Sequence, residues 1–375
     1  MILTQTSAIF VDAYRALRAR KMFWIVLALS GLVMAGFAAF GIDESGLKFI
    51  VWRVSSSPNT HDISPAVMYK WIFTNVALDT WLAWIASILA LISTAGIFPE
   101  LISSGSIDLL LAKPIGRVRL FLTEYVAGLL FVVLQVFLFS LASFLLIGIR
   151  GGEWEPGLFL AVPLVVCFFS YLFSVCVFLG LLTRSTVAAL LLTLLFWFVL
   201  YGLNTADTGL LMFKLAEENR AAIIQRDLGS LQAHVETLEA LHEQPTTRQA
   251  KDIRESRTRI DSLQEKRRRA LGTAEKLGKV QRVIYLVKSF LPKTDETVML
   301  TERVLISVAD LPTGKSTQVE PGQTYNYDRP DPEKAGKALA KSLRSRSVAW
   351  VLGTSLAFEL VFLAWGAVIF CRRDF

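Results

Sequence analysis

The chain has 375 residues, of which 53% are hydrophobic and 19% are charged, with a formal net charge of +7 and a mean hydropathy of +0.49. This composition excludes an ordinary soluble domain of this length and predicts an all-α polytopic membrane protein. The three cysteines indicate no disulfide framework, because Cys167 and Cys176 fall in one apolar run and Cys371 at the end of another.

Residues 1–22 come before the first apolar run, and their apolar positions share one helical face: Phe10, Val11, Tyr14 and Leu17. A basic stretch before an apolar run also resembles a signal peptide. The amphipathic pattern favours the other interpretation, a cytoplasmic helix on the membrane surface followed by an uncleaved anchor.

Apolar runs of about 20 residues are long enough to cross the hydrocarbon layer as helices. Six runs of this kind predict six spans: 23–41, 76–97, 120–148, 158–183, 187–204 and 347–370. Basic residues flank the first and last runs, so both termini are expected in the cytoplasm. This orientation puts segment 98–119 in the cytoplasm and the long stretch between the last two spans outside.

Segment 98–119 interrupts two apolar runs with several charged residues and an amphipathic stretch, "IDLLLAKPI", which ends at Pro114. An amphipathic helix facing the cytoplasm fits a groove on a partner protein. The alternative is a surface loop whose cations contact lipid phosphates. The residues of the segment that could contact a partner are Glu100, Gly105, Asp108, Leu110, Leu111, Lys113, Pro114 and Arg117.

Three acidic residues fall within predicted spans: Asp79, Glu124 and Glu359. An ionisable group in hydrocarbon is costly and usually faces a partner or a cavity. Glu359, near the middle of the last span, is the best candidate for a buried polar role. The alternative is a hydrogen-bonded residue that only packs the bundle.

Residues 205–345 are polar and form the predicted extracytoplasmic insert, in which apolar residues recur at alternating spacings of four and three. This rhythm is typical of a coiled-coil seam. The seam residues are Ile224, Leu228, Leu231, Val235, Leu238, Ile260 and Leu263. Pro245 separates the two arms, so we expect a helical hairpin over about 210–278, with arms of roughly 30 residues or about 45 Å.

The rest of the insert predicts an interfacial helix over about 280–291 and a small β-rich part over about 295–330. Its "TGKST", at 313–317, lacks the earlier glycine and the following helix of a phosphate-binding loop and is interpreted as a turn. The spacing of the three histidines indicates no metal site.

The residues of segment 98–119 resemble the type-2 permease family of ATP-binding cassette transporters. That family's cytoplasmic segment has an acid, a Ser-Gly pair, two leucines, then Pro and Arg. The matching positions are Glu100, Ser104, Gly105, Asp108, Leu110, Leu111, Pro114 and Arg117. The surface helix, the six spans and the short tail 371–375 extend the resemblance, whereas the large insert departs from the compact members.

The resemblance implies a permease subunit that pairs with a second permease subunit, identical or not. A separate ATPase, which binds ATP and Mg²⁺, would drive it. Segment 98–119 would couple the permease to this ATPase, so its residues named above are the candidate coupling residues. The chain itself would then be no enzyme, would need no cofactor and would bind no nucleic acid. It would lie in the bacterial cytoplasmic membrane, with export the expected direction, and the sequence names no substrate.

Two other function classes compete with the permease. A membrane-anchored scaffold or sensor would use the hairpin to bind an envelope partner, but six spans exceed what an anchor needs. An intramembrane enzyme would require paired acids, a Ser–His pair or a metal cluster within the spans, and the sequence has none.

Overall fold

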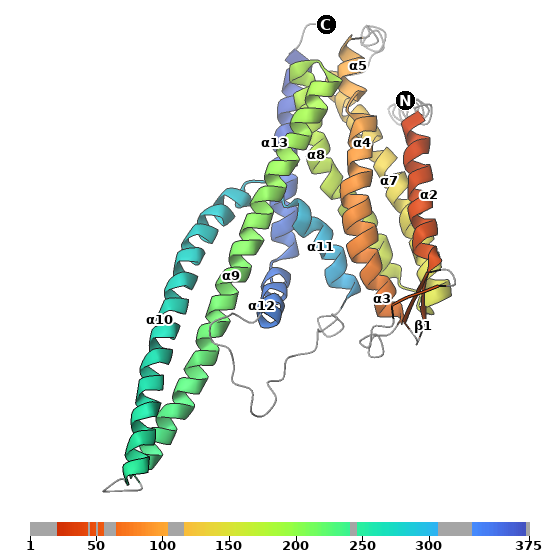
Figure 1. The fold of residues 1–375 in the computed structure, drawn as a ribbon. Helices are drawn as coiled ribbons and strands as arrows, with labels where there is room; N and C mark the ends of the chain where they lie inside the picture. Colours follow the sequence, from red (N-terminus) through yellow and green to blue (C-terminus); the bar gives the residue numbers. More distant parts are fainter. Residues whose placement is uncertain are drawn as a thin grey trace. The chain divides into compact units, whose positions relative to one another are not determined.

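The computed structural model describes residues 21–43, 46–49, 52–55, 65–103, 116–240, 246–306 and 332–372 (Figure 1). Predicted features outside these ranges include the surface helix over most of 1–22. The first described helix is α2, Lys21–Ala39, followed by an antiparallel sheet of order β1-β2-β3. Its strands are Phe40–Asp43, Gly46–Phe49 and Trp52–Ser55. We did not predict this sheet, because strands of four residues leave little periodicity.

Long helices make up most of the rest of the chain. They are α3 (Pro65–Ile72), the π-helix η1 (Phe73–Ala86), α4 (Ser87–Thr94), α5 (Ile97–Ser103), α7 (Arg117–Gly151), the short 3₁₀ helix η2 (Pro156–Leu160), α8 (Ala161–Thr183), α9 (Thr186–Ala240), α10 (Thr247–Ser289), α11 (Thr294–Leu305), α12 (Pro332–Arg344) and α13 (Val348–Arg372). The predominantly helical architecture confirms the helical part of the predicted fold class.

Five helical stretches of the described chain are long and apolar enough to cross a membrane: Tyr69–Ile102, Arg117–Arg150, Pro156–Thr183, Thr186–Ala240 and Val348–Arg372. They contain the predicted second to sixth spans and indicate a membrane protein. The predicted first span, 23–41, overlaps α2, whose apolar part Trp24–Ala39 is shorter. The six-span count therefore stays a prediction.

One prediction for the insert was wrong, and a second was wrong over the residues that the structure describes. No separate interfacial helix begins near residue 280, because α10 continues without a break to Ser289. The predicted β-rich part begins instead with helix α11, Thr294–Leu305, and its remainder over 307–330 lies outside the described residues. The β-branched residues after 297 favoured strands, but Val298 and Thr301 are buried in a helix, where tertiary packing overrides local preference.

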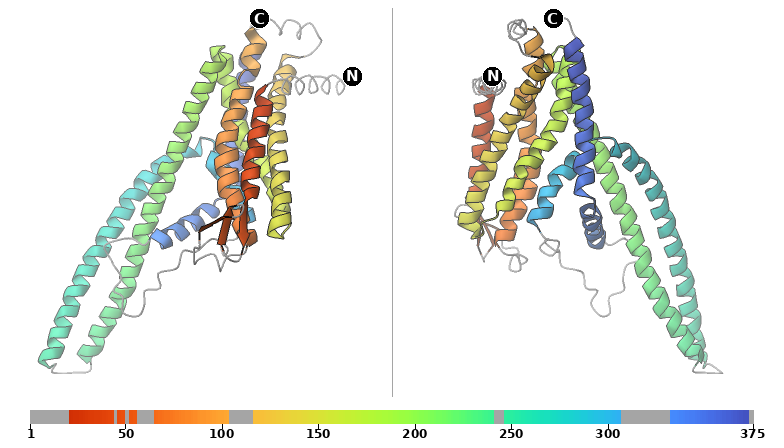
Figure 2. Two further views of the ribbon diagram at one scale, coloured as in Figure 1. Left: turned by 45° about the vertical axis from the view of Figure 1, so that its right-hand side comes forward. Right: turned by 180° about the vertical axis from the view of Figure 1, so that it is seen from behind.

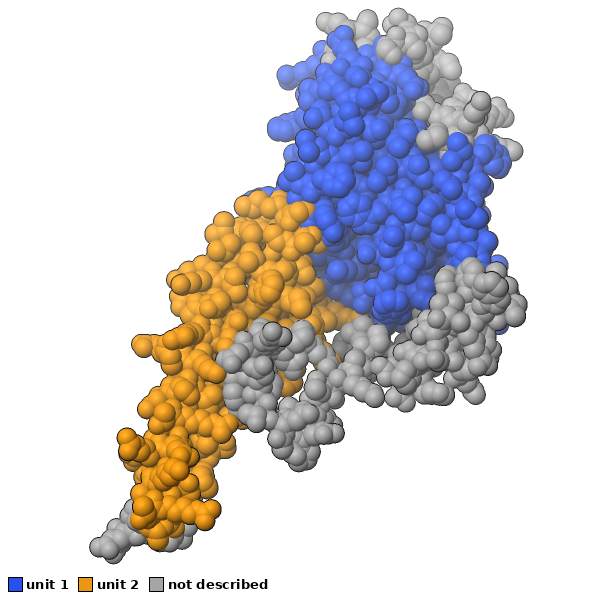
Figure 3. All heavy atoms as spheres, viewed as in Figure 1, with its two compact units in different colours: residues 1–201, 290–312, 347–375 blue, residues 202–289, 313–346 orange. Residues whose placement is uncertain are grey.

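The chain divides into two compact units, coloured in Figure 3. Unit 1 comprises residues 1–201, 290–312 and 347–375, and unit 2 comprises 202–289 and 313–346. The division falls within the continuous helix α9, close to the predicted boundary between residues 204 and 205.

Unit 1 has one large apolar core, rich in aromatic side chains, to which α7, α8 and α13 contribute. α8 packs against both other helices and against α11. The start of α11 is held to α13, because the Lys293 backbone N–H donates to Ser355 Oγ at 2.9 Å and Lys293 Nζ lies 5.0 Å from the centre of the Trp350 ring.

Unit 2 contains two helical arms, α9 and α10, which run side by side in the views of Figures 1 and 2. Its small apolar cluster consists of Ile224, Leu228 and Leu263, with the partly buried Leu231 and Ile260 packed against it. Of the other predicted seam residues, Val235 is buried and Leu238 is half-buried, and neither belongs to this cluster.

Candidate functional site

Helix α5 carries the start of the candidate coupling segment and is anchored by an aromatic cluster of three rings, Phe98, Phe121 and Phe370. The Phe98 centroid lies 5.1 Å from that of Phe121 on α7 and 6.5 Å from that of Phe370 on α13. The other two rings lie 5.8 Å apart. Each side chain is at most 1% exposed. Rings at such distances attract one another beyond their burial, so α5, α7 and α13 are joined at this point.

Two further contacts hold this region together. A Cβ built at Gly180 of α8 would lie 3.2 Å from Pro99 Cγ of α5, so glycine permits the close approach of the two helices. Arg117 Nη1, at the start of α7, donates to the Cys371 carbonyl oxygen at 3.0 Å. Both described ends of the candidate coupling segment are therefore attached to the spans.

The structure describes Glu100 and Arg117 of the predicted coupling residues, Glu100 on α5 as exposed and Arg117 as half-buried. The other predicted coupling residues lie outside the described part: Gly105, Asp108, Leu110, Leu111, Lys113 and Pro114. Figures 1 and 2 show that α5, the turn between α8 and α9, and the end of α13 lie at the same end of unit 1. That end carries Arg117, Arg119, Arg184 and Arg372.

Glu359 of α13 lies at the centre of a polar cluster within the spans and is 8% exposed. Tyr125 Oη of α7 donates to Glu359 Oε1 at 2.8 Å, and Ser170 Oγ of α8 donates to Glu359 Oε2 at 2.8 Å. Within the described chain, no cation forms an ion pair with Glu359. This polar cluster, which we call the Glu359 cluster, connects α7, α8 and α13 through hydroxyl groups. Helices α7 and α13 also contribute to the aromatic cluster.

The other two acids predicted within spans lie elsewhere. Asp79, on the π-helix η1, lines a cavity of about 190 Å³ together with Asp295 and Glu302 of α11 and the aromatic Trp84 and Tyr201. Glu124, on α7, is half-buried. The described residues contain no group of three or more His, Cys, Asp or Glu that could hold a metal ion. The structure thus does not bring Asp79, Glu124 and Glu359 into one site.

A second buried carboxylate, Asp207 of α9, organises unit 2. It is 0% exposed and lies between two cations: Lys288 Nζ of α10 is 3.2 Å from Asp207 Oδ2, and Arg346 Nη2 is 3.3 Å from the same oxygen. Gln281 Nε2 donates to Asp207 Oδ1 at 2.7 Å, and Lys288 also donates to Asn204 Oδ1. This cluster, which we call the Asp207 cluster, connects α9, α10 and the residues after α12.

Tyr125, Ser170 and the Asp207 cluster were not predicted from the sequence. Acidic residues in apolar runs indicate Glu124 but not the neighbouring Tyr125, because residues with hydroxyl groups are common in spans and do not by themselves indicate a site. Asp207 and Lys288 each left a signal, since each is an isolated charge beside an apolar run: "LNTADTGLLMF" and "VIYLVKSF". Their separation of 81 residues concealed the pairing.

Residues 31–212 match the model of a family described as "Protein of unknown function (DUF2705)". The match begins inside α2 and ends inside α9, so it covers α5 and α7 but leaves out the second arm of the hairpin and α13. No curated protein and no solved structure matches the chain. The description of this family gives no activity that could be compared with the site.

Proposed function

We propose that the chain is the membrane-spanning permease subunit of an ATP-binding cassette transporter, driven by a separate ATPase subunit. The observation that carries the proposal is the attachment of segment 98–119 at both ends. Its first residues belong to α5, which contacts α7, α8 and α13, and Arg117 at its other end binds the end of α13. Movement imposed on the segment would therefore reach three spans.

The same helices provide a second point of connection deeper in unit 1. Tyr125, Ser170 and Glu359 hold α7, α8 and α13 together by hydrogen bonds of 2.8 Å. Packed helices with two defined arrangements can transmit a change from one end to the other. In this proposal the aromatic cluster receives the movement of the ATPase, and the Glu359 cluster keeps the three helices moving together.

The remaining parts of the proposal follow from orientation. The end of unit 1 that carries Arg117, Arg119, Arg184 and Arg372 faces the cytoplasm, in agreement with the excess of basic residues expected there. With α2 as the first of six spans, both termini are cytoplasmic and the hairpin, formed as a coiled coil, is outside. A second permease subunit completes the membrane part, and the transport direction is export.

The experiment that tests this function is a pull-down of the ATPase subunit, with ATP hydrolysis measured in the same detergent. Leu110→Asp puts a carboxylate into a dry groove on the ATPase, which costs about 2 kcal/mol or more and lowers association by well over about tenfold. Glu100→Ala removes a rim charge, so the complex assembles but hydrolysis loses its coupling to the permease.

Val304→Asp is the matched control, because Val304 of α11 is 60% exposed and lies outside segment 98–119. It should leave pull-down and hydrolysis unchanged. Undiminished pull-down and coupled hydrolysis in both the Leu110→Asp and the Glu100→Ala chains would refute the coupling role. Recovery of an envelope protein in place of an ATPase would instead favour a scaffold.

A further inference from the structure

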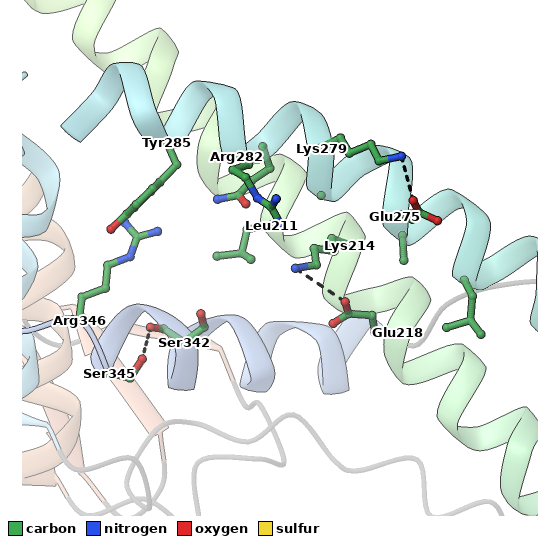
Figure 4. A pocket seen from close by; sticks show the side chains of 14 residues that line it. Leu211, Lys214, Glu218, Glu275, Lys279, Arg282, Tyr285, Ser342, Ser345 and Arg346 are labelled. Carbon is green, nitrogen blue, oxygen red and sulfur yellow. Dashed lines mark hydrogen bonds and ion pairs between the residues drawn. The ribbon is translucent and has the colours of Figure 1, made fainter. Parts of the chain in front are cut away.

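Unit 2 contains an open cavity of about 780 Å³, lined by α9, α10 and the C-terminal end of α12 with the residues after it (Figure 4). This volume falls within the range of ligand sites, roughly 300–1,000 Å³. Four cationic side chains from all three segments line the cavity: Lys214, Lys279, Arg282 and Arg346. Leu211 and Leu271 give it an apolar wall.

Carboxylates compensate these cations only in part. Lys279 Nζ lies 2.8 Å from Glu275 Oε1, and Lys214 Nζ lies 3.7 Å from Glu218 Oε1, which is a loose pair. Arg282 makes no hydrogen bond or ion pair with any residue that the structure describes. Among the described residues, the cavity and the Asp207 cluster beside it contain five cations and three carboxylates, an excess of two positive charges.

The Asp207 cluster makes the site rigid on one side. Arg346 lines the cavity and is fixed in place twice, by Asp207 Oδ2 at 3.3 Å and by the Tyr285 ring, whose centre is 5.2 Å from Arg346 Cζ. A guanidinium held in this way loses little side-chain entropy when it binds an anion. The site therefore combines one preorganised cation, Arg346, with one unpaired cation, Arg282.

The last turns of α10 separate two kinds of surface. Lys279, Arg282 and Tyr285 line the cavity, whereas a row of aliphatic side chains is exposed, each between 49% and 61%: Val280, Val283, Leu286 and Val287. Exposed aliphatic residues beside a basic surface are typical of a helix in contact with the interface of a bilayer.

The position of the cavity along the chain agrees with a location at the interface of the bilayer. Leu211 and Lys214 follow the predicted end of the fifth span, residue 204, by about two and three helical turns. On the other side, Arg346 precedes Val348, the first residue of the span α13. Both connections put the lining residues within reach of the headgroup layer, where phosphate groups are concentrated.

We propose that this cavity binds the phosphate group of an anionic membrane phospholipid, whose acyl chains lie against the exposed aliphatic row of α10. Arg282 and Arg346 donate to the phosphate oxygens, Lys214 adds a third positive charge, and Leu211 and Leu271 contact the glycerol and first methylene groups. The inference goes beyond the proposed transport function and holds whether or not an ATPase drives the chain.

Native mass spectrometry of the full chain, purified and delipidated in detergent, tests the proposal with phosphatidylglycerol, phosphatidylcholine and glycerol 1-phosphate as probes. The wild-type chain should retain phosphatidylglycerol in preference to phosphatidylcholine. Replacing both Lys214→Gln and Arg282→Gln should lower the affinity for phosphatidylglycerol by about tenfold or more, because charge-assisted hydrogen bonds are lost. Binding of phosphatidylcholine should not change.

The matched control is the double variant Arg254→Gln and Arg259→Gln. Both arginines are exposed on α10, the helix that carries Arg282, and neither lines the cavity. This control should bind phosphatidylglycerol as the wild type does, and circular dichroism should show equal helicity in all three chains. An equal loss in both double variants, or no loss in either, would overturn the proposal. Displacement of the lipid by an equal concentration of glycerol 1-phosphate would overturn the lipid assignment in favour of a soluble phosphate.

Discussion

The two units each bury a carboxylate that connects three segments of the chain, but they satisfy it in opposite ways. Glu359 in unit 1 accepts hydrogen bonds from two hydroxyl groups, those of Tyr125 and Ser170. Asp207 in unit 2 lies between the two cations Lys288 and Arg346 and also accepts from Gln281. Glu359 thus has neutral hydroxyl donors, whereas Asp207 contacts two cations.

This difference determines how much each cluster depends on its own carboxylate. Without Glu359, each hydroxyl still has a backbone acceptor, because Tyr125 Oη lies 3.0 Å from the Ser170 carbonyl oxygen and Ser170 Oγ lies 2.8 Å from that of Cys167. Without Asp207, the largely buried Lys288 and Arg346 lose the carboxylate that both of them contact, which is far more costly. We therefore expect the fold to tolerate replacement of Glu359 but to depend on Asp207.

The largest effect is expected for Asp207→Ala. It removes the carboxylate that lies 3.2 Å from Lys288 Nζ and 3.3 Å from Arg346 Nη2, whose side chains are 7% and 12% exposed, and should lower the free energy of unfolding of unit 2 by about 3–5 kcal/mol. Hydrogen exchange of the backbone amides in the last turns of α10 should accelerate by roughly 10²-fold or more.

Glu236→Ala on the same helix is the control for Asp207→Ala, because Glu236 is exposed and should change exchange by little. Adding Lys288→Met to Asp207→Ala should recover part of the loss, since one of the two cations that contacted Asp207 is then removed together with it. Equal exchange in the Asp207→Ala and Glu236→Ala chains would show that the buried ion pairs contribute nothing to unit 2.

The second effect concerns the hydroxyl donors of unit 1. Tyr125→Phe combined with Ser170→Ala leaves the buried Glu359 with no donor among the described residues, and we expect a loss of about 1–3 kcal/mol. Thermal unfolding in detergent should show a lower midpoint. Ser174→Ala is the control, because the Ser174 hydroxyl, also buried on α8, donates only to the backbone carbonyl of Tyr171. A midpoint no lower than that of Ser174→Ala would mean that Glu359 finds other partners.

A smaller effect on stability is expected for Glu359→Gln, which keeps the shape of the side chain and one carbonyl acceptor. Thermal unfolding should change by less than about 1 kcal/mol, since both hydroxyl donors keep an acceptor. In the permease proposal, transport-coupled ATP hydrolysis should nevertheless fall. A loss of stability as large as that of the double variant at Tyr125 and Ser170 would remove the distinction between replaceable and structural carboxylates.

The smallest effect involves an exposed carboxylate, Glu275, which Lys279 approaches to 2.8 Å. The hydrogen bond from Lys279 lowers the pKa of Glu275 below its ordinary value. The pair therefore stabilises α10 above the unfolded-state pKa of a glutamate, about 4.3, and this contribution is lost as the pH falls through the lowered pKa. Helicity of wild type and Glu275→Gln should differ slightly at pH 7 and converge at acidic pH. A difference that persists in acid would contradict the assignment.

The sequence predicted the spans because length and apolarity alone define them, and five of the predicted runs lie within suitably long helices. It also identified Glu359, because a carboxylate in the middle of an apolar run stands out. It could not identify the partners of Glu359, since a tyrosine and a serine in apolar runs look the same whether they bond to the backbone or to a carboxylate.

Errors in the insert have a similar physical origin. Residues 280–289 were interpreted as a separate interfacial helix because their apolar residues share one helical side and Pro292 follows, whereas the helix α10 continues through them to Ser289. Residues 297–301 read as β-rich from Thr297, Val298 and Thr301, whose burial within unit 1 overrides their local preference. In both places, the deciding information is tertiary packing, which spacing along the chain does not contain.

Labelling of single cysteines with an impermeant thiol reagent in intact cells tests most directly the central claim that the α5 end of unit 1 faces the cytoplasm and the hairpin lies outside. The three native cysteines are first replaced, and cysteine is then introduced at Ser103, Ser230 or Thr247. We predict labelling at Ser230 and Thr247, which are exposed on α9 and α10, and none at Ser103, the last residue of α5. Labelling at Ser103 with protection of Ser230 and Thr247 would reverse the orientation and contradict the proposed coupling to a cytoplasmic ATPase.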